Sequence, residues 1–224
     1  MDYLKTLIIR FKNEIKFYEV PALRGGILSS IGENKNILFH NHSDDGFRYS
    51  YPLIQYKRIN GKAAMICIKD GIETIGEFFA SNDTTINISG REISLEIESI
   101  IPERLLIQTW DKSFSYCIRK WLPLNSENFQ KYMQIESLKD KILFLEGILR
   151  GNLLSFAKGV DIHIESQIIC EILQISEPFI VKNKGVKLMS FDIEFKTNLS
   201  IPNFIGIGKN ASLGYGIITK IKTN

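Results

Sequence analysis

Two of the three histidines, His40 and His42, are separated by a single residue. Side chains at positions i and i+2 of an extended strand point to the same face, so this spacing brings both imidazoles to one surface. Imidazole titrates near neutral pH, so one ring can accept a proton while the other donates one. Tyr49 follows seven residues after His42 and can face the pair if the chain folds back between them. These residues form a candidate acid–base site, with a polar sheet edge or a metal-binding pair as alternatives.

A metal site at this position would need further ligands. The nearest carboxylates are Glu33, Asp44 and Asp45, and their spacing matches neither a zinc triad nor a two-metal carboxylate set. We therefore expect no metal and no other cofactor. The third histidine, His163, alternates with apolar residues and is expected to be a partly exposed strand residue.

A second candidate site lies near the end of the chain, where the glycine pairs Gly206/Gly208 and Gly214/Gly216 enclose five residues that include Lys209. Glycine permits positive φ and close backbone approach, and backbone N–H groups beside a cation can bind an anion. A dinucleotide-binding turn would need a following helix and a downstream acid, and a Walker loop would need Ser or Thr after the Lys. We expect neither pattern here, and a plain connection between two strands is the simpler alternative.

The tripeptide Arg24-Gly25-Gly26 is a third candidate, in a segment expected to be helical from Pro21 to Ser30. Each glycine inside a helix costs roughly 1 kcal/mol relative to alanine. The pair therefore indicates close approach by another backbone, either a neighbouring element or the glycine-rich loop. A structural reason explains the pair as well as a bound ligand does.

The composition is that of a folded protein with sizeable cores, at 224 residues and 44% apolar content. Its net charge of +3 is unevenly distributed, because residues 179–224 contain seven Lys and two acidic residues. A basic segment suits a polyanion, although solvated lysine-rich edges are common. The three cysteines, Cys67, Cys117 and Cys170, lie in separate apolar runs and are expected to be buried free thiols. With no signal peptide or membrane span recognised, a cytoplasmic protein is expected.

The first half of the chain shows the pattern β-α-β-β-α-β, which is the split βαβ order of ferredoxin-like domains. The expected elements are a strand at 3–11, a helix at 21–30, a hairpin of 47–58 with 62–69, a helix at 72–80 and alternating residues at 84–100. Asn60-Gly61 is a favoured two-residue turn for the hairpin. Pro102 is the predicted seam between two domains.

The second half is expected to be another α+β unit of similar size. Its expected elements are a hairpin of 104–109 with 113–120 turning at Asp111-Lys112, helices at 126–134 and 137–157, and strands at about 160–181, 186–196 and 213–222. The predicted fold class is therefore α+β, with two tandem ferredoxin-like (RRM-like) domains and antiparallel sheets. The predicted domains are residues 1–101, which carry the histidine pair, and 102–224, which end in the glycine-rich loop.

The C-terminal loop resembles the signature of the CRISPR-associated repeat-processing endoribonucleases, members of the glycine-rich-loop RAMP superfamily. Their pattern Gly-h-Gly-x5-Gly-h-Gly with an internal Lys is matched by 206–216 and Lys209. In one branch of the family, the site has two histidines separated by one residue and a tyrosine nine residues after the first, as in His40, His42 and Tyr49. The loop also occurs in non-catalytic subunits of CRISPR effector complexes, so it does not by itself establish cleavage.

The resemblance implies a metal-independent endoribonuclease that cuts precursor CRISPR RNA within its repeats. The 2′-hydroxyl of the RNA would attack the adjacent phosphate and leave 2′,3′-cyclic phosphate and 5′-hydroxyl ends. His40 and His42 would serve as general base and general acid, in an order that the sequence does not fix. Tyr49 would position the phosphate or share in proton transfer.

The resemblance also implies a set of RNA-binding residues, which are Arg24, Gly206, Gly208, Lys209, Ser212, Gly214 and Gly216. The expected partner is CRISPR repeat RNA, as a stem-loop or a single strand, bound by a monomer or a homodimer. Other CRISPR effector subunits are further candidate partners. Two alternatives stay open, a non-catalytic RNA-binding subunit of an effector complex and a ferredoxin-like protein that binds a small molecule. The small-molecule alternative predicts no RNA affinity and no steep dependence on salt.

Aromatic residues in the second half are candidates for stacking on unpaired RNA bases. They are Trp110, Phe114, Tyr116 and Trp121. For each of them, a position in the core or at a domain contact is the simpler expectation.

Overall fold

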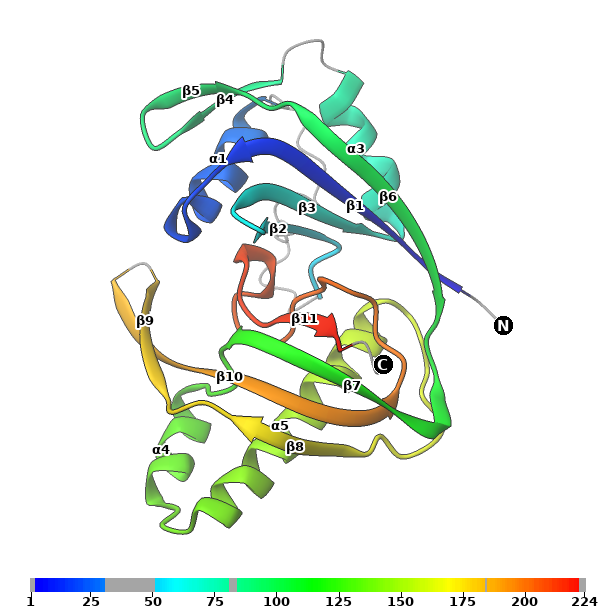
Figure 1. Cartoon of the computed structure of the whole chain (residues 1–224), viewed down its shortest axis with the longest axis vertical. Helices are drawn as coiled ribbons and strands as arrows, with labels where there is room; N and C mark the ends of the chain where they lie inside the picture. Colours follow the sequence, from blue (N-terminus) through cyan, green and yellow to red (C-terminus); the bar gives the residue numbers. More distant parts are fainter. Residues whose placement is uncertain (1–2, 31–50, 81–83, 184, 222–224) are drawn as a thin grey trace, which may run out of the picture. The chain divides into compact units, whose positions relative to one another are not determined.

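The computed structural model describes residues 3–30, 51–80, 84–183 and 185–221 (Figure 1). The chain divides into two compact units. The first unit joins Met1–Leu105 with Ser212–Gly214, and the second joins Leu106–Ala211 with Tyr215–Asn224. The predicted seam at Pro102 lies inside strand β6 (Ile97–Leu106), and the domain limits 1–101 and 102–224 stay predictions.

The first unit is built on a four-stranded sheet in the order β2-β3-β1-β6. Its elements are β1 (Tyr3–Glu14), η1 (Phe17–Glu19), α1 (Val20–Ser30), β2 (Ile54–Ile59), β3 (Lys62–Ile68), α3 (Asp70–Ala80), β4 (Thr85–Ile88), β5 (Arg91–Ser94) and β6. Helices α1 and α3 follow the first and third strands, which is the ferredoxin-like order. Strands β4 and β5 form a separate hairpin between α3 and the last strand of the sheet.

Alternation of apolar residues explains how the sheet of the first unit packs. Alternate residues of each strand, such as Phe11 and Met65, point to one face and join a single buried cluster. Helix α1 adds Leu23 to that cluster and α3 adds Phe78, so both helices contribute to the same core. The β2–β3 hairpin turns at Asn60-Gly61, where both residues have positive φ, as predicted for a favoured two-residue turn.

The second unit is built on a five-stranded antiparallel sheet. Its main path runs β11-β7-β10-β8, and β9 pairs with β10. The elements are β7 (Thr109–Trp121), α4 (Ser126–Gln134), α5 (Leu138–Gly159), β8 (Cys170–Ile175), β9 (Phe179–Asn183), β10 (Val186–Leu199), η2 (Ala211–Leu213) and β11 (Ile217–Lys220). The sequence fixes the starts of both helices through side-chain caps, since Asn125 accepts the N–H of Asn128 and Ser137 accepts that of Asp140.

Two sequence-based expectations about the second unit are wrong. Strand β7 runs straight through Asp111-Lys112, so the predicted hairpin of 104–109 with 113–120 does not form. Pairing with β10 holds β7 extended on both sides of this dipeptide, and a register shift beside Leu199 absorbs the irregularity. Residues 160–169 form no strand, although apolar and polar residues alternate there, and β8 begins only at Cys170.

The fold class agrees with the prediction. Each unit has an antiparallel sheet with the strand order of a ferredoxin-like domain, so the protein is an α+β chain of two such domains in tandem. The three cysteines are free and buried, as expected. Burial raises the pKa of the Cys67 thiol to about 12 and that of Cys170 to about 11, which keeps both protonated.

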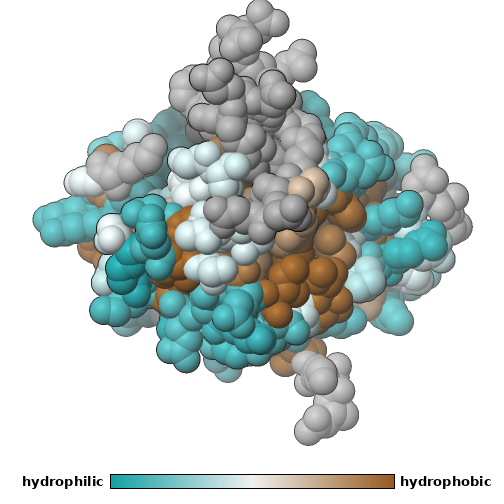
Figure 2. All heavy atoms as spheres, turned by 90° about the horizontal axis from the view of Figure 1, so that it is seen from above, coloured by the Kyte–Doolittle hydropathy of each residue, from teal (hydrophilic) through white to brown (hydrophobic). Residues whose placement is uncertain are grey.

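The surface carries mainly polar residues with some apolar ones among them. Figure 2 shows this mixture on one face, where hydrophilic residues surround a smaller group of hydrophobic ones. In the first unit, Ile97, Ile100 and Ile101 of β6 are partly exposed. None of the helices in the described ranges is long and apolar enough to cross a membrane.

Candidate nucleic-acid interface

The predicted acid–base residues His40, His42 and Tyr49 lie outside the described residues. They fall in the stretch of chain between α1 and β2, which both belong to the first unit. The nearby carboxylates at 33, 44 and 45 lie in the same stretch. The roles assigned to these residues therefore stay predictions, and the described site is the glycine-rich loop with its surroundings.

The glycines of the loop are required by its backbone geometry. Gly208, Gly214 and Gly216 have φ values of 79°, 83° and 61°, a region that side-chain-bearing residues rarely adopt. A Cβ at Gly216 would overlap the carbonyl oxygen of Ile207. A Cβ at Gly208 would lie 3.0 Å from the carbonyl oxygen of Leu122, tighter than an ordinary contact. The glycine spacing therefore reflects close packing of the loop backbone against itself and against the end of β7.

Several N–H groups of the loop are engaged within the protein. The N–H of Ile207 donates to the carbonyl of Gly216 at 3.0 Å, and that of Gly216 donates to Lys120 at 3.0 Å. The N–H of Lys209 donates to the carbonyl of Leu122 at 3.1 Å. These three groups are therefore not available to phosphates, whereas the Lys209 side chain is exposed. Lys120 and Leu122 could not be recognised from their residue types, because both hold the loop through backbone carbonyls.

The aromatic candidates separate into core residues and a surface residue. Trp121 is fully buried, and its indole N–H donates to Asn152 on α5 at 3.0 Å. Tyr116 is also buried, its hydroxyl accepts the N–H of Ile201, and burial raises its pKa to about 12. Trp110 is 37% exposed and carries the Lys112 ammonium 5.7 Å from its ring centre. The core expectation is therefore confirmed for Trp121 and Tyr116.

The glycine pair on α1 has a structural explanation at one position only. A Cβ on Gly26 would lie 3.0 Å from the carbonyl oxygen of Asn87 and 3.0 Å from the Ile86 Cβ, so strand β4 approaches the helix there. A Cβ on Gly25 would meet nothing within 4 Å. The close approach predicted from the pair is thus made by a neighbouring element, and Arg24 lies half-buried beside it on the same helix.

The structure distributes the predicted RNA-binding residues over both units. Arg24, Ser212 and Gly214 belong to the first unit, and the remaining loop residues belong to the second. A Cβ on Gly214 would lie 3.4 Å from the Phe17 ring, so the tip of the loop packs against residues of the first unit to which it is assigned. His163 is exposed, as expected, but lies in the irregular stretch before β8 instead of a strand.

Exposed lysines cluster on the hairpin of β9 and β10 in the second unit. Lys182 and Lys187 are direct partners in this ladder, and both side chains are exposed. Like charges placed opposite each other destabilise a sheet, and a bound polyanion would relieve that repulsion. This hairpin and Lys209 therefore present exposed cationic side chains on the second unit.

Comparison with known families covers nearly the whole chain. Residues 2–104 match the Cas6b N-terminal domain, and residues 108–221 match the Cas6b C-terminal domain. The chain belongs to the Cas6b family. This finding confirms the family predicted from the glycine-rich loop and the histidine pair.

Solved Cas6b structures share the fold of this chain over 98% of its length. A crystal structure of Cas6b is 28% identical, with a TM-score of 0.88 over 98% of this chain and 100% of that chain. A crystal structure of the CRISPR RNA processing endoribonuclease Cas6b is 27% identical, with a TM-score of 0.73 and the same coverage. The uncharacterized protein MJ0978 of Methanocaldococcus jannaschii is 38% identical over 105 residues, which are 47% of this chain and 70% of that protein.

Proposed function

We propose that this member of the Cas6b family is an endoribonuclease that cuts precursor CRISPR RNA within its repeats. The match to both Cas6b domains, over residues 2–104 and 108–221, carries this proposal. The similarity to a structure named as a CRISPR RNA processing endoribonuclease supports it, because that match covers 98% of the chain. The substrate class and the reaction come from this relationship, and the residues come from the sequence.

The proposed reaction uses the RNA as its own nucleophile. One imidazole of the pair His40 and His42 removes the proton of the 2′-hydroxyl, and the O2′–P bond forms. The P–O5′ bond breaks as the other imidazole donates a proton to the leaving oxygen. The products are a 2′,3′-cyclic phosphate and a 5′-hydroxyl, with Tyr49 positioning the phosphate. Each acid–base group is expected to contribute roughly 10²–10⁴-fold to the rate.

The described residues would hold the RNA backbone during this reaction. Lys209 is exposed on a loop whose backbone is fixed by its own hydrogen bonds, so its ammonium extends from a rigid support. Lys182 and Lys187 add two exposed cations on the β9–β10 hairpin. Phosphate contacts of this kind give affinity and position without reading the base sequence.

The test is cleavage of a repeat RNA by wild-type protein and by His40→Ala and His42→Ala, with His163→Ala as the matched control. His163 is an exposed histidine of the second unit, so its removal is expected to leave cleavage unchanged. Each of the other two changes is expected to slow cleavage by at least about 10²-fold. A repeat with a 2′-deoxy sugar at the cut site is expected to stay intact.

Three results would contradict the proposal in different ways. Cleavage of the deoxy substrate would rule out attack by the 2′-hydroxyl, and loss of activity in excess EDTA would indicate a metal-dependent reaction. Tight binding of the repeat without cleavage would instead support a non-catalytic RNA-binding subunit. No affinity for the repeat, at low or moderate salt, would leave the small-molecule alternative.

A further inference from the structure

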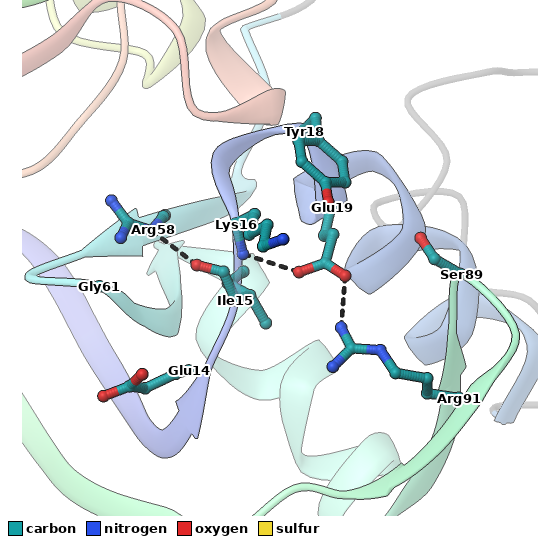
Figure 3. Close-up of a pocket in the computed structure, with 9 residues that line it drawn as sticks. All are labelled: Glu14, Ile15, Lys16, Tyr18, Glu19, Arg58, Gly61, Ser89 and Arg91. Carbon is teal, nitrogen blue, oxygen red and sulfur yellow. Dashed lines mark hydrogen bonds and ion pairs between the residues drawn. The ribbon is translucent and has the colours of Figure 1, made fainter.

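A pocket of about 630 Å³ lies in the first unit, and its lining contains no residue of the glycine-rich loop. Its walls come from the β1–η1 connection, the β2–β3 hairpin and the β4–β5 turn, which are far apart in the chain (Figure 3). Among its lining residues are Lys16, Tyr18, Glu19, Arg58, Ser89 and Arg91. Cations outnumber carboxylates in this lining, at three to two.

Glu19 is a structural anchor of the pocket and does not dominate its charge. Its carboxylate accepts the backbone N–H of Lys16 at 2.7 Å and an N–H of the Arg91 guanidinium (Figure 3). The side chain of Glu19 is only 5% exposed, so its charge is balanced by Arg91 inside the wall. The Arg91 side chain is itself 57% exposed, which leaves part of its guanidinium facing solvent.

Arg58 and Lys16 provide the cations that an anionic ligand would meet. The Arg58 Nε–H donates to the carbonyl of Ile15 at 2.6 Å, which fixes the plane of the guanidinium. Within the described ranges, the two terminal nitrogens of Arg58 make no hydrogen bond. These nitrogens are the donors of a bidentate contact with a phosphate. The Lys16 side chain is exposed, and Glu19 accepts the backbone N–H of Lys16.

Tyr18 adds a large exposed ring at the same pocket. The residue is 69% exposed, and the Lys16 ammonium lies 5.7 Å from the ring centre. An aromatic side chain held beside cations suits a nucleotide, since the ring can stack on a base while the cations bind its phosphate. A free inorganic anion has no base to stack on the Tyr18 ring.

We propose that this pocket binds one nucleotide of the RNA strand, with its two flanking phosphates on Lys16 and Arg58 and its base stacked on Tyr18. The inference rests on the proposed function, because it takes the RNA as ligand. It adds a binding subsite on the first unit that lies outside the glycine-rich loop and the histidine pair. The Tyr18 ring and the fixed Arg58 guanidinium are what distinguish this pocket from a solvated cluster of charges.

The test measures binding of a labelled repeat RNA by anisotropy, between 50 and 200 mM salt, for Tyr18→Ala and Lys16→Gln. Neither change removes the anchoring contacts of Glu19, which use the Lys16 backbone and Arg91. Tyr18→Ala is expected to weaken binding at least about fivefold, from the loss of one stacked base. Lys16→Gln is expected to lower the slope of log affinity against log salt by about 0.7 to 1.

The chain offers matched controls for both variants. Tyr3 is 52% exposed and also lies under a cation, Arg104, at 5.3 Å, but it is not part of the pocket. Lys12 is an exposed lysine on β1, paired with Glu96. Tyr3→Ala and Lys12→Gln are expected to bind the repeat as wild type does. Tyr18→Phe keeps the ring and is expected to keep the affinity.

Failure of this inference can be separated from failure of the proposed function. If Tyr18→Ala and Lys16→Gln bind like wild type while wild type cleaves the repeat, the pocket proposal is overturned and the activity stands. If both variants lose affinity but no protein cleaves, the pocket stands and the cleavage proposal fails. If Tyr18→Phe loses as much affinity as Tyr18→Ala, the stacking contact is overturned.

Discussion

The two units share one sheet order but differ in the connection that precedes their last strand. In the first unit, with the sheet order β6-β1-β3-β2, the chain between β3 and the last strand β6 includes helix α3. In the second unit, with the order β11-β7-β10-β8, residues 200–216 connect β10 to the last strand β11 (Figure 1). Helix α3 is held by buried side chains such as Phe78. The loop of the second unit is held by backbone contacts at its glycines and by buried residues such as Ile207.

This difference predicts how each connection responds to substitution. A helix held by its apolar face tolerates changes on its exposed face, because its own hydrogen bonds remain. A loop held by positive φ values and backbone contacts has no such tolerance at those positions, because any side chain alters both. The second unit therefore has, in the place of a helix that tolerates substitution, a loop whose conformation depends on a few glycines.

The largest effect is expected for Gly216→Ala. The residue has a φ of 61°, and the added Cβ would overlap the carbonyl oxygen of Ile207. Strain and overpacking together are expected to cost at least about 3 kcal/mol of the free energy of unfolding. The measurement is the urea midpoint followed by circular dichroism.

Gly151→Ala is the matched control in the same unit. Gly151 lies on α5 with nothing within 4 Å of an added Cβ, so the change is expected to stabilise by up to about 1 kcal/mol. A Gly216→Ala protein that unfolds at the wild-type midpoint would show that the loop can shift, and would remove the contrast between the two connections.

The second prediction concerns a charge that the first unit buries. Lys57 on β2 is fully buried, and burial lowers its pKa to about 7. In the unfolded chain the pKa of a lysine is about 10.4. Between pH 10 and pH 7 the unfolded state therefore takes up a proton that the folded state does not. The stability of the wild type is therefore expected to fall as the pH is lowered through this range. Below about pH 7 both states are protonated and the penalty stays constant.

Lys57→Met is expected to remove this dependence. Relative to wild type, the variant should gain a few kcal/mol, about 2 to 4, at pH 6 and little at pH 10. The check is the urea midpoint at both values, with Lys5→Met as the control, since Lys5 is exposed on β1. An equal gain at both pH values would mean that the buried ammonium is not the cause. Within the described residues, the second unit buries no Lys, Arg, Asp or Glu side chain, so no comparable effect is expected there.

Much of the fold could be read from local signals in the sequence. The helix at 126–134 and the Asn60-Gly61 turn were predicted at their observed positions because caps and turn residues act on their own neighbours. The Asp111-Lys112 turn was wrong because pairing with β10 outweighs a weak local turn signal. The strand expected at about 160–181 begins only at Cys170, because alternation of apolar and polar residues does not by itself supply a pairing partner for 160–169.

For the sites too, features set by neighbouring residues could be predicted from the sequence, and features set by distant residues could not. The glycines of the loop were recognisable because their spacing is local, and the histidine pair stays a prediction. The engagement of the Lys209 N–H by Leu122 could not be read, since backbone carbonyls carry no residue signature. The pocket around Tyr18 was missed because three separate segments of the chain build it.

A smaller effect is expected at the glycine pair of α1 in the first unit. Gly26→Ala would place a Cβ 3.0 Å from both Asn87 O and Ile86 Cβ, and is expected to cost about 1 to 3 kcal/mol. Gly25→Ala meets open space and is expected to gain up to about 1 kcal/mol. Thermal unfolding of the two variants side by side measures the difference. If both variants are more stable than wild type, β4 can move away from α1. The first unit would then tolerate substitution at its helix better than the second unit does at its loop.

The smallest effect on stability, and the sharpest on binding, is expected for Lys209→Gln. The side chain is exposed and its backbone N–H still bonds to Leu122, so the urea midpoint should not change. If Lys209 contacts a phosphate, the salt slope of repeat RNA binding falls by about 0.7 to 1. Lys182→Gln, on the β9–β10 hairpin, is the matched comparison. A slope that falls only for Lys182→Gln would show that the hairpin contacts RNA phosphates and that the loop serves the fold alone.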